Sequence, residues 1–297
     1  MRSGAERATV CPVPPLALAL LLAAAVLHAS WNLLVRGAED RLVFTWWAQV
    51  MIAPLAIPVL LAGPPLRGVW PYVLASALLE AGYFATLAVA YGRGDFSLVY
   101  PLARGAAPLL LAAGAALVLH ERPSPGGLVG LAVLAAGLAV VGGAPLWRRQ
   151  HHGESGSRGA GWALGVALFI ALYSLVDGAA VRRFPPASYT LLVFGLSAVL
   201  AGPPLLLLRG GRAFGTEWSR SWRKIPLVGA FSLFSYILVL QAFKIAPVAY
   251  VGAVREVSIV LAALAGWRLL GENFGPTRTV GALLVVTGIA LIALFGT

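Results

Sequence analysis

The chain has very little cysteine and very little charge for its length of 297 residues. Its single cysteine, Cys11, excludes an intramolecular disulfide and a metal cluster built from cysteines. Charged residues make up only 11% of the sequence and hydrophobic residues 60%, and the mean hydropathy is +0.86. This balance excludes an ordinary soluble domain and predicts a polytopic membrane protein whose solvent is the lipid bilayer.

Sequence signatures of catalysis and of nucleotide use are also missing. No G-x-x-x-x-G-K-[ST] motif occurs, which disfavours primary active transport. There is no His-rich metal motif, no nucleophile with an accompanying base, and no glycine loop that would hold a phosphate. His151 and His152 are neighbours in a polar stretch without further ligands. We therefore expect no enzyme, no catalytic residue, no bound metal and no cofactor.

Positive charge predominates, with 22 Lys and Arg against 11 Asp and Glu, and a formal net charge of +11. The basic residues are scattered over short connections, which are too short to form a nucleic-acid-binding domain. We expect no nucleic-acid partner and interpret these residues as orientation signals and contacts to lipid head groups. Between Arg209 and Lys224 the basic residues alternate with Trp218 and Trp222, a pattern typical of anchoring at the membrane interface.

Long apolar runs predict ten membrane-spanning helices, because a span needs about 20 apolar residues. Residues 1–27 look like a signal peptide, but their apolar run continues to Val35 and is long enough to be a retained first helix. Pro101 and Pro108 in the fourth span, and Pro54 and Pro58 in the second, predict kinks. The expected spans are Pro15–Val35, Val43–Leu61, Val69–Tyr91, Ser97–Leu119, Gly126–Leu146, Gly161–Val181, Ser188–Leu208, Ile225–Phe243, Val248–Leu270 and Thr279–Phe295.

The two halves of the chain match at a single offset, 255 − 104 = 151, which carries Arg104 onto Arg255. The polar stretch from Trp147 to Gly161 is the natural linker between them. We therefore predict two five-helix repeats, residues 1–150 and 151–297. Because five is odd, the second repeat enters the bilayer with the opposite orientation, and the repeats are inverted. The same offset pairs Glu121 with Glu272, Pro125 with Pro276, Gly130 with Gly281 and Gly137 with Gly288.

The glycines in these pairs predict helix packing. Gly130 and Gly137 lie seven residues apart, two turns along one helix face, and Gly281 and Gly288 repeat the spacing in the last span. Small residues on one face allow two membrane helices to approach closely.

Five ionisable residues lie inside the expected spans: Glu80, Arg104, Asp177, Arg255 and Glu256. Charge at membrane depth is costly, so each needs a partner or a water-filled cavity. One interpretation is that each arginine is locked in an ion pair with Glu80 or Asp177 and only holds the bundle together. The other is that its forked donor binds a carboxylate or phosphate of a substrate.

Proton coupling is predicted from the same five residues. Three carboxylates against two arginines leave one acid unmatched, and such an acid can take up and release protons during a cycle. Glu256 is expected to point away from the face of Arg255, because helical neighbours diverge by about 100°. Glu80 and Asp177 are therefore the coupling candidates.

Polar and aromatic residues at membrane depth complete a predicted cavity, because a binding site needs a few polar groups among apolar walls. We predict a cavity lined by the first, third, fourth, sixth, eighth and ninth spans. Tyr236 and Tyr250 are interpreted as residues of the interfacial aromatic belt. The predicted substrate-binding residues are Trp31, Asn32, Tyr100, Arg104, Tyr173 and Arg255.

Three segments carry a family resemblance: HASWNLLVR in the first span, SLVYPLARGAAPLLLAAGAALVLHER in the fourth and VAYVGAVREVSIVLAALAGWRLLGEN in the ninth. With the duplicated ten-span plan they resemble the drug/metabolite transporter superfamily, EamA type, over nearly the whole chain. Glu121 and Glu272 close their spans where that family typically has a Gly-Glu pair, and His120 departs from the pattern.

The resemblance implies a permease of the bacterial-type cytoplasmic (inner) membrane with both termini in the cytoplasm. It does not select a substrate, since members carry amino acids, sugars, nucleotide conjugates, drugs and other metabolites. The distribution of Lys and Arg points the other way, because more of them flank the spans on the face opposite the N-terminus. We favour the orientation that the resemblance implies.

The sequence as a whole predicts an all-α secondary transporter that moves a small polar, anionic or zwitterionic metabolite by alternating access, with protons as the coupling ion. An integral-membrane enzyme acting on lipid head groups and a non-transporting membrane scaffold or sensor are the alternatives. The first lacks catalytic motifs and the second lacks a soluble output domain.

Overall fold

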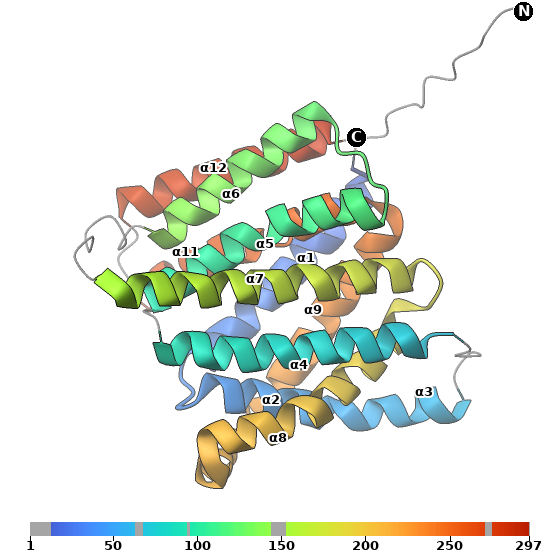
Figure 1. Ribbon diagram of the computed structural model, residues 1–297, viewed down its shortest axis with the longest axis vertical. Coiled ribbons are helices and arrows are strands. Elements are labelled where there is room, and N and C mark those ends of the chain that lie inside the picture. Colours follow the sequence, from blue (N-terminus) through green and yellow to red (C-terminus); the bar gives the residue numbers. More distant parts are fainter. Residues whose placement is uncertain (1–12, 63–67, 94–95, 144–152, 271–274, 297) are drawn as a thin grey trace, which may run out of the picture.

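The computed structural model describes residues 13–62, 68–93, 96–143, 153–270 and 275–296, and this part of the chain is all-helical. The helices lie side by side as one bundle (Figure 1). They are α1 (Pro15–Val35), α2 (Arg41–Ile52), the 3-10 turn η1 (Ala53–Leu55), α3 (Ala56–Ala62), α4 (Trp70–Arg93), α5 (Phe96–Val118), α6 (Pro125–Gly143), α7 (Gly153–Val181), α8 (Pro186–Ser221), α9 (Ile225–Ile245), α10 (Val248–Val254), α11 (Val257–Leu270) and α12 (Pro276–Phe295).

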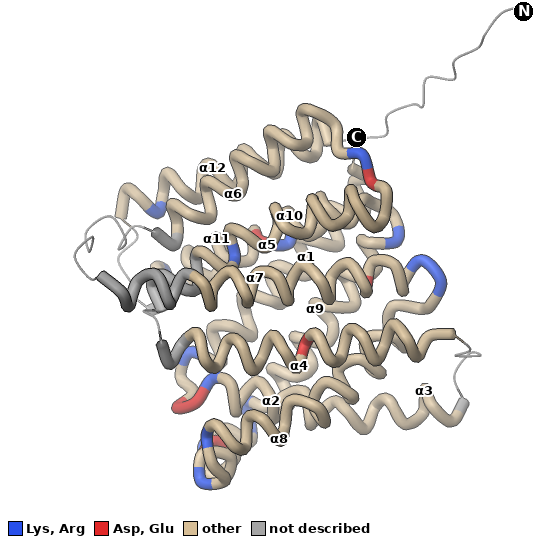
Figure 2. The backbone as a smooth tube through the Cα atoms, in the orientation of Figure 1, with Lys and Arg blue, Asp and Glu red and all other residues tan. Residues whose placement is uncertain are grey.

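The lengths and composition of these helices are those of a multi-pass membrane protein. Eight segments are long and apolar enough to cross a membrane, and Leu102–Val118 in α5 and Pro125–Val141 in α6 are shorter apolar helices. Most Lys and Arg residues gather at the two ends of the bundle (Figure 2). We call the end at which α1 begins the first face and the end at which α1 finishes the second face. The count of ten spans remains a prediction.

Two predicted spans are interrupted. Helix α2 gives way to a 3-10 turn that contains Pro54, which confirms the predicted kink. The expected span Val248–Leu270 is also not one helix, because α10 ends at Val254 and α11 begins at Val257. At this break the N–H of Glu256 donates to the carbonyl of Ala253 at 3.0 Å, a tightened bond that spans three residues instead of four. No proline or glycine marks the position, so the sequence pattern gave no sign of it.

The connection between the halves is shorter than the sequence predicts. Helix α7 begins at Gly153 and not at Gly161, so the second part of the expected linker is helical. Once a span is helical, adding a residue costs little, because each one gains a backbone hydrogen bond. The predicted boundary between residues 150 and 151 lies outside the described residues.

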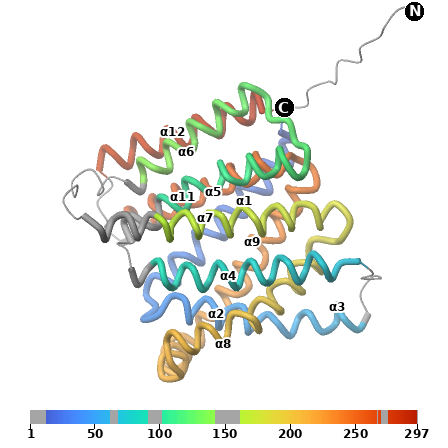
Figure 3. Tube along the Cα trace, viewed as in Figure 1, coloured from blue at the N-terminus to red at the C-terminus, as the bar shows by residue number. Residues whose placement is uncertain are grey.

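Close packing of α6 against α12 joins segments that are far apart in the chain (Figure 3). A Cβ atom placed on Gly137 would lie 2.6 Å from the backbone nitrogen of Val285, and one on Gly288 would lie 2.6 Å from that of Leu134. A Cβ on Gly281 would lie 2.6 Å from the backbone nitrogen of Val141, and one on Gly130 would lie 2.9 Å from that of Ile292. The four glycines therefore form the contact surface of the two helices, which confirms the predicted packing face.

We predict that Gly137→Ala lowers the stability of the purified protein, because the added methyl group must push α12 away. Such overpacking costs about 1–3 kcal/mol. The matched control is Gly215→Ala, because a Cβ at that position meets nothing within 4 Å. Thermal unfolding in detergent compares the two variants, and equal melting temperatures would contradict the proposed glycine contact.

Candidate functional site

A cavity of about 250 Å³ lies inside the bundle and reaches towards the second face. Val35 at the end of α1 and Arg41 at the start of α2 both line it, which places its mouth beside the connection between these helices. The lining side chains come from α1, α2, α4, α5, α7, α8 and α9, together with Arg255 at the break after α10. The predicted set of spans lacked α2 and α8, whose residues Gln49 and Phe194 contribute to the wall.

Most of the predicted site residues meet at this cavity. Asp177 does not line it, and the side chain of Tyr100 lies outside the described residues. The predicted residues that line the cavity are Trp31, Asn32, Glu80, Arg104, Tyr173 and Arg255.

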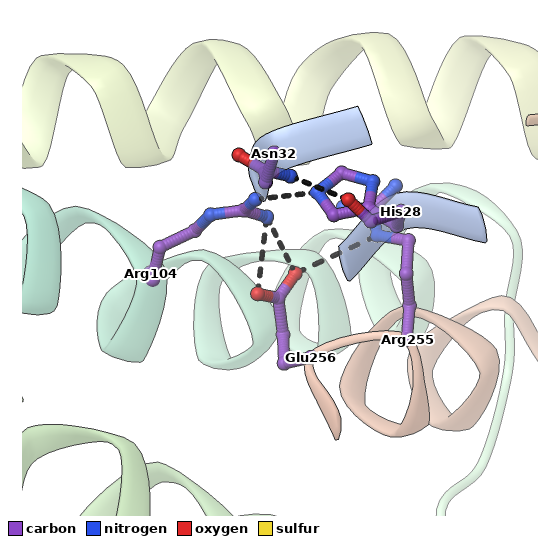
Figure 4. A network of polar contacts seen from close by, with 5 residues as sticks. All are labelled: His28, Asn32, Arg104, Arg255 and Glu256. Carbon is purple, nitrogen blue, oxygen red and sulfur yellow. Dashed lines mark hydrogen bonds and ion pairs between the residues drawn. The ribbon is translucent and has the colours of Figure 1, made fainter. Parts of the chain in front are cut away.

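Arg104 is held by an ion pair with Glu256 (Figure 4). Its Nη1 donates to both carboxylate oxygens of Glu256, at 3.1 and 3.0 Å. Glu256 is fully buried, and its Oε1 also lies 3.5 Å from Nε of Arg255. The predicted partners of the arginines, Glu80 and Asp177, were therefore wrong. The tightened turn between α10 and α11 and the length of the Arg255 side chain bring both neighbours into one network.

His28 is the second partner of Arg104, with its Nε2 3.1 Å from Nη2 of the guanidinium. A guanidinium has no acceptor, so His28 must accept this bond and carry its own proton on Nδ1. The ring also packs edge-on against Trp31, and the Asn32 side chain donates to the backbone carbonyl of His28. These residues share one helix face at spacings of three and four, a signal from which the role of His28 was predictable.

Several polar atoms of the cavity wall have no hydrogen-bond partner among the described residues. They are Nε1 of Trp31, Oε1 of Gln49, Oε2 of Glu80 and Nε of Arg255. Buried polar atoms are nearly always satisfied, so a group of four around one cavity marks the positions where a ligand would bind. Among the described residues no group of three or more His, Cys, Asp or Glu is placed to hold a metal ion.

Asp177 lies behind the cavity wall and is fully buried. It accepts hydrogen bonds from the hydroxyls of Tyr189, at 2.6 Å, and of Tyr236. Tyr236 itself lines the cavity, so it connects Asp177 to the interior. Its interpretation as a belt residue was wrong. Ser232, Ser235 and Val239 line the cavity from the same face of α9, a helical spacing that indicates an inward position.

At the first face the bundle is closed by contacts between the two halves. Glu121 accepts hydrogen bonds from the backbone N–H groups of Val248 and Ala249, at 2.9 and 3.2 Å, and pairs with Arg182 at 3.1 Å. Tyr250 is only 1% exposed and accepts a bond from the backbone of Ser124, so it too was wrongly interpreted as a belt residue.

The structure explains why the family pattern has glycine at the position of His120. His120 has a φ of 56°, in the left-handed region that favours glycine. The backbone therefore makes a turn at the end of α5 for which glycine is the better residue, and Glu121 follows this turn directly. The Gly-Glu pair of the resembling family fits the same geometry.

An all-helical membrane bundle whose cavity carries several polar side chains among apolar walls and reaches towards one face is an architecture that suits a membrane transporter. Residues 157–294 match the family model of the EamA-like transporter family. The chain is similar to "Uncharacterized transporter YwfM" of Bacillus subtilis (strain 168), with 24% identity over 232 residues, which are 75% of this chain and 73% of that protein. These matches support an EamA-type membrane transporter of the drug/metabolite transporter superfamily and point to a transporter rather than an enzyme.

A solved crystal structure has the same fold. It superimposes with a TM-score of 0.75 at 20% sequence identity, covering 94% of this chain and 98% of its own. This likeness concerns the fold alone.

Proposed function

We propose that the protein is a secondary transporter that moves a small polar metabolite with an anionic or zwitterionic head group across the cytoplasmic membrane. The observation that carries this proposal is the group of polar atoms without a hydrogen-bond partner among the described residues, around a cavity that reaches towards the second face. Nε of Arg255 and Nε1 of Trp31 are donors that suit a carboxylate or phosphate. Oε2 of Glu80 and Oε1 of Gln49 are acceptors that suit an ammonium or hydroxyl group.

The two arginines have different roles in this proposal. Arg104 is engaged by Glu256 and His28 and positions the network. Arg255 keeps its Nε without a hydrogen bond to any described residue and lies only 3.5 Å from Glu256. We therefore assign the direct contact with the substrate anion to Arg255.

Two inverted repeats account for the way the helices pack. Under the offset of 151 residues, α1 corresponds to α7, α2 to α8, α4 to α9, and α5 to α10 with α11. Helix α4 packs against α7 as α9 packs against α1, and α5 packs against α7 as α11 packs against α1. Likewise α4 contacts α8 as α9 contacts α2. Each of these contacts has a counterpart in which the two halves exchange places, as a two-fold relation between the repeats requires. This supports ten spans in two repeats that rock against each other between two states.

Alternating access then depends on the closure at the first face. The bonds that Glu121 accepts from the start of α10 join the connection between α5 and α6 of the first repeat to the second repeat. In the proposed cycle these bonds break when the cavity opens to the first face and closes at the second. Both termini are placed in the cytoplasm, as the family resemblance implies.

We predict that Arg255→Lys weakens substrate binding about 10–100-fold, because one charge-assisted hydrogen bond contributes about 1.5–3 kcal/mol and an ammonium lacks the forked geometry. A thermal-shift screen of the wild-type protein against a metabolite library first identifies the ligand. Binding and uptake into liposomes are then compared with Arg183→Lys, an exposed arginine at the first face. Equal affinity of both variants and wild type would contradict the assignment.

Proton coupling is assigned to Glu80 or Asp177. Replacing the responsible acid by its amide, Glu80→Gln or Asp177→Asn, is expected to abolish the dependence of uptake on a pH gradient, because an amide cannot carry a proton through the cycle. The control is Glu39→Gln, an exposed acid at the second face. If Glu80→Gln and Asp177→Asn both keep the full response to the pH gradient, these two acids do not couple protons to transport.

A further inference from the structure

The segment that follows the seventh predicted span is a separate helix at the second face. Gly210 has a φ of 74°, which no residue inside a regular helix adopts, and it divides α8 into the spanning part and a short C-terminal part. Figure 1 shows this last part of α8 turned out of line with the rest of the helix. We call residues 211–224 the surface segment.

The surface segment is amphipathic. Phe214, Glu217 and Ser221 are buried, at spacings of three and four that define one helix face. Two indole rings lie at the border of this buried face, with Trp218 38% and Trp222 52% exposed, and Trp218 also packs against Trp47. The rest of the segment's surface exposes Arg212, Arg220, Arg223 and Lys224.

Positive charge on this surface is only partly neutralised. Arg220 pairs with Glu39, and Arg209, just before the segment, pairs with Asp40 at 3.2 Å. The only acid within the segment is Glu217, which is 1% exposed and turned inward. Arg212, Arg223 and Lys224 therefore present their charge outward, beside the exposed indoles.

The surface segment is also tied to the mouth of the cavity. Glu217 accepts hydrogen bonds from the backbone N–H groups of Glu39 and Asp40, at 3.0 and 2.9 Å. Asp40 in turn caps the start of α2 by accepting from Leu42 and Val43. Leu42 and the neighbouring Arg41 line the cavity. A displacement of the surface segment would therefore also move Arg41 and Leu42 at the cavity mouth.

We propose that the surface segment binds the head groups of anionic phospholipids and that this binding fixes the position of α2 at the cavity mouth. Cations bind anionic lipid head groups in whichever leaflet these occur, and indole rings at the same level favour the membrane interface. A soluble anion would satisfy the cations but would leave the exposed indoles in water, so a lipid fits the whole surface better. The effect on the mouth rests on the proposed function, whereas lipid binding does not.

The first test is the melting temperature of the purified protein in mixed micelles that contain either phosphatidylglycerol or phosphatidylcholine. Phosphatidylglycerol is expected to raise it by about 2–4 °C over phosphatidylcholine in the wild type. Arg212→Gln/Lys224→Gln should lose this difference. Arg122→Gln/Lys244→Gln, which removes one exposed Arg and one exposed Lys at the first face, should keep it. Equal shifts in both double variants, or the same shift with glycerol phosphate in solution, would overturn the proposal.

The second test follows the cavity mouth without any transport assay. Thr45 lines the cavity from α2, so a Thr45→Cys substitution in a Cys11→Ser chain reports access to it. Maleimide labelling of this cysteine is expected to differ between vesicles with and without phosphatidylglycerol, and the difference should vanish with Arg212→Gln/Lys224→Gln. Labelling that is indifferent to lipid charge would refute the link to the mouth. Because no substrate is needed, a failure here is distinct from a failure of the transport assays.

Discussion

The buried carboxylate of Glu256 compensates the positive charge that the chain carries into the middle of the bundle. Arg104 comes from the first half of the chain and Arg255 from the second, and Glu256 contacts both. A buried charge without a partner is strongly destabilising, so this one acid makes both arginines tolerable inside a membrane. The break between α10 and α11 lies at Arg255 and Glu256, and Arg255 lines the cavity.

Glu256 neutralises the two arginines unequally, and this difference gives them different roles at the site. Arg104 makes two bonds to Glu256 and one contact with His28, whereas Arg255 has a single, longer approach to the same carboxylate. Equivalent positions of a duplicated chain thus differ in how much of their hydrogen-bonding capacity is used. The proposed substrate contact at Arg255 and the positioning role of Arg104 both follow from this difference.

Most helix positions and most of the cavity residues were predictable from the sequence, because they depend on apolar run length and on polar residues within apolar runs. The division into two repeats stays a prediction. The packing of Gly137 and Gly288 was predictable because close helix contact requires small residues at a fixed spacing. The partner of Arg104 was not predictable, because a regular helix would direct Glu256 away from it. The tightened turn between α10 and α11 brings Glu256 towards Arg104. Tyr236 was misjudged because an aromatic residue in a span is compatible with both the interface and the interior.

The central claim is that Glu256 and Arg104 stabilise each other inside the bundle, and a double-mutant cycle measures this directly. The unfolding free energies of Arg104→Gln, Glu256→Gln and the double variant are compared with wild type by SDS titration in mixed micelles. Each single variant should lose about 3–5 kcal/mol, because Glu256→Gln leaves both arginines without their acid and Arg104→Gln leaves Glu256 with only the longer contact to Arg255. The double variant should lose less than the sum, with a coupling energy of about 0.5–3 kcal/mol. Additive losses would contradict the account.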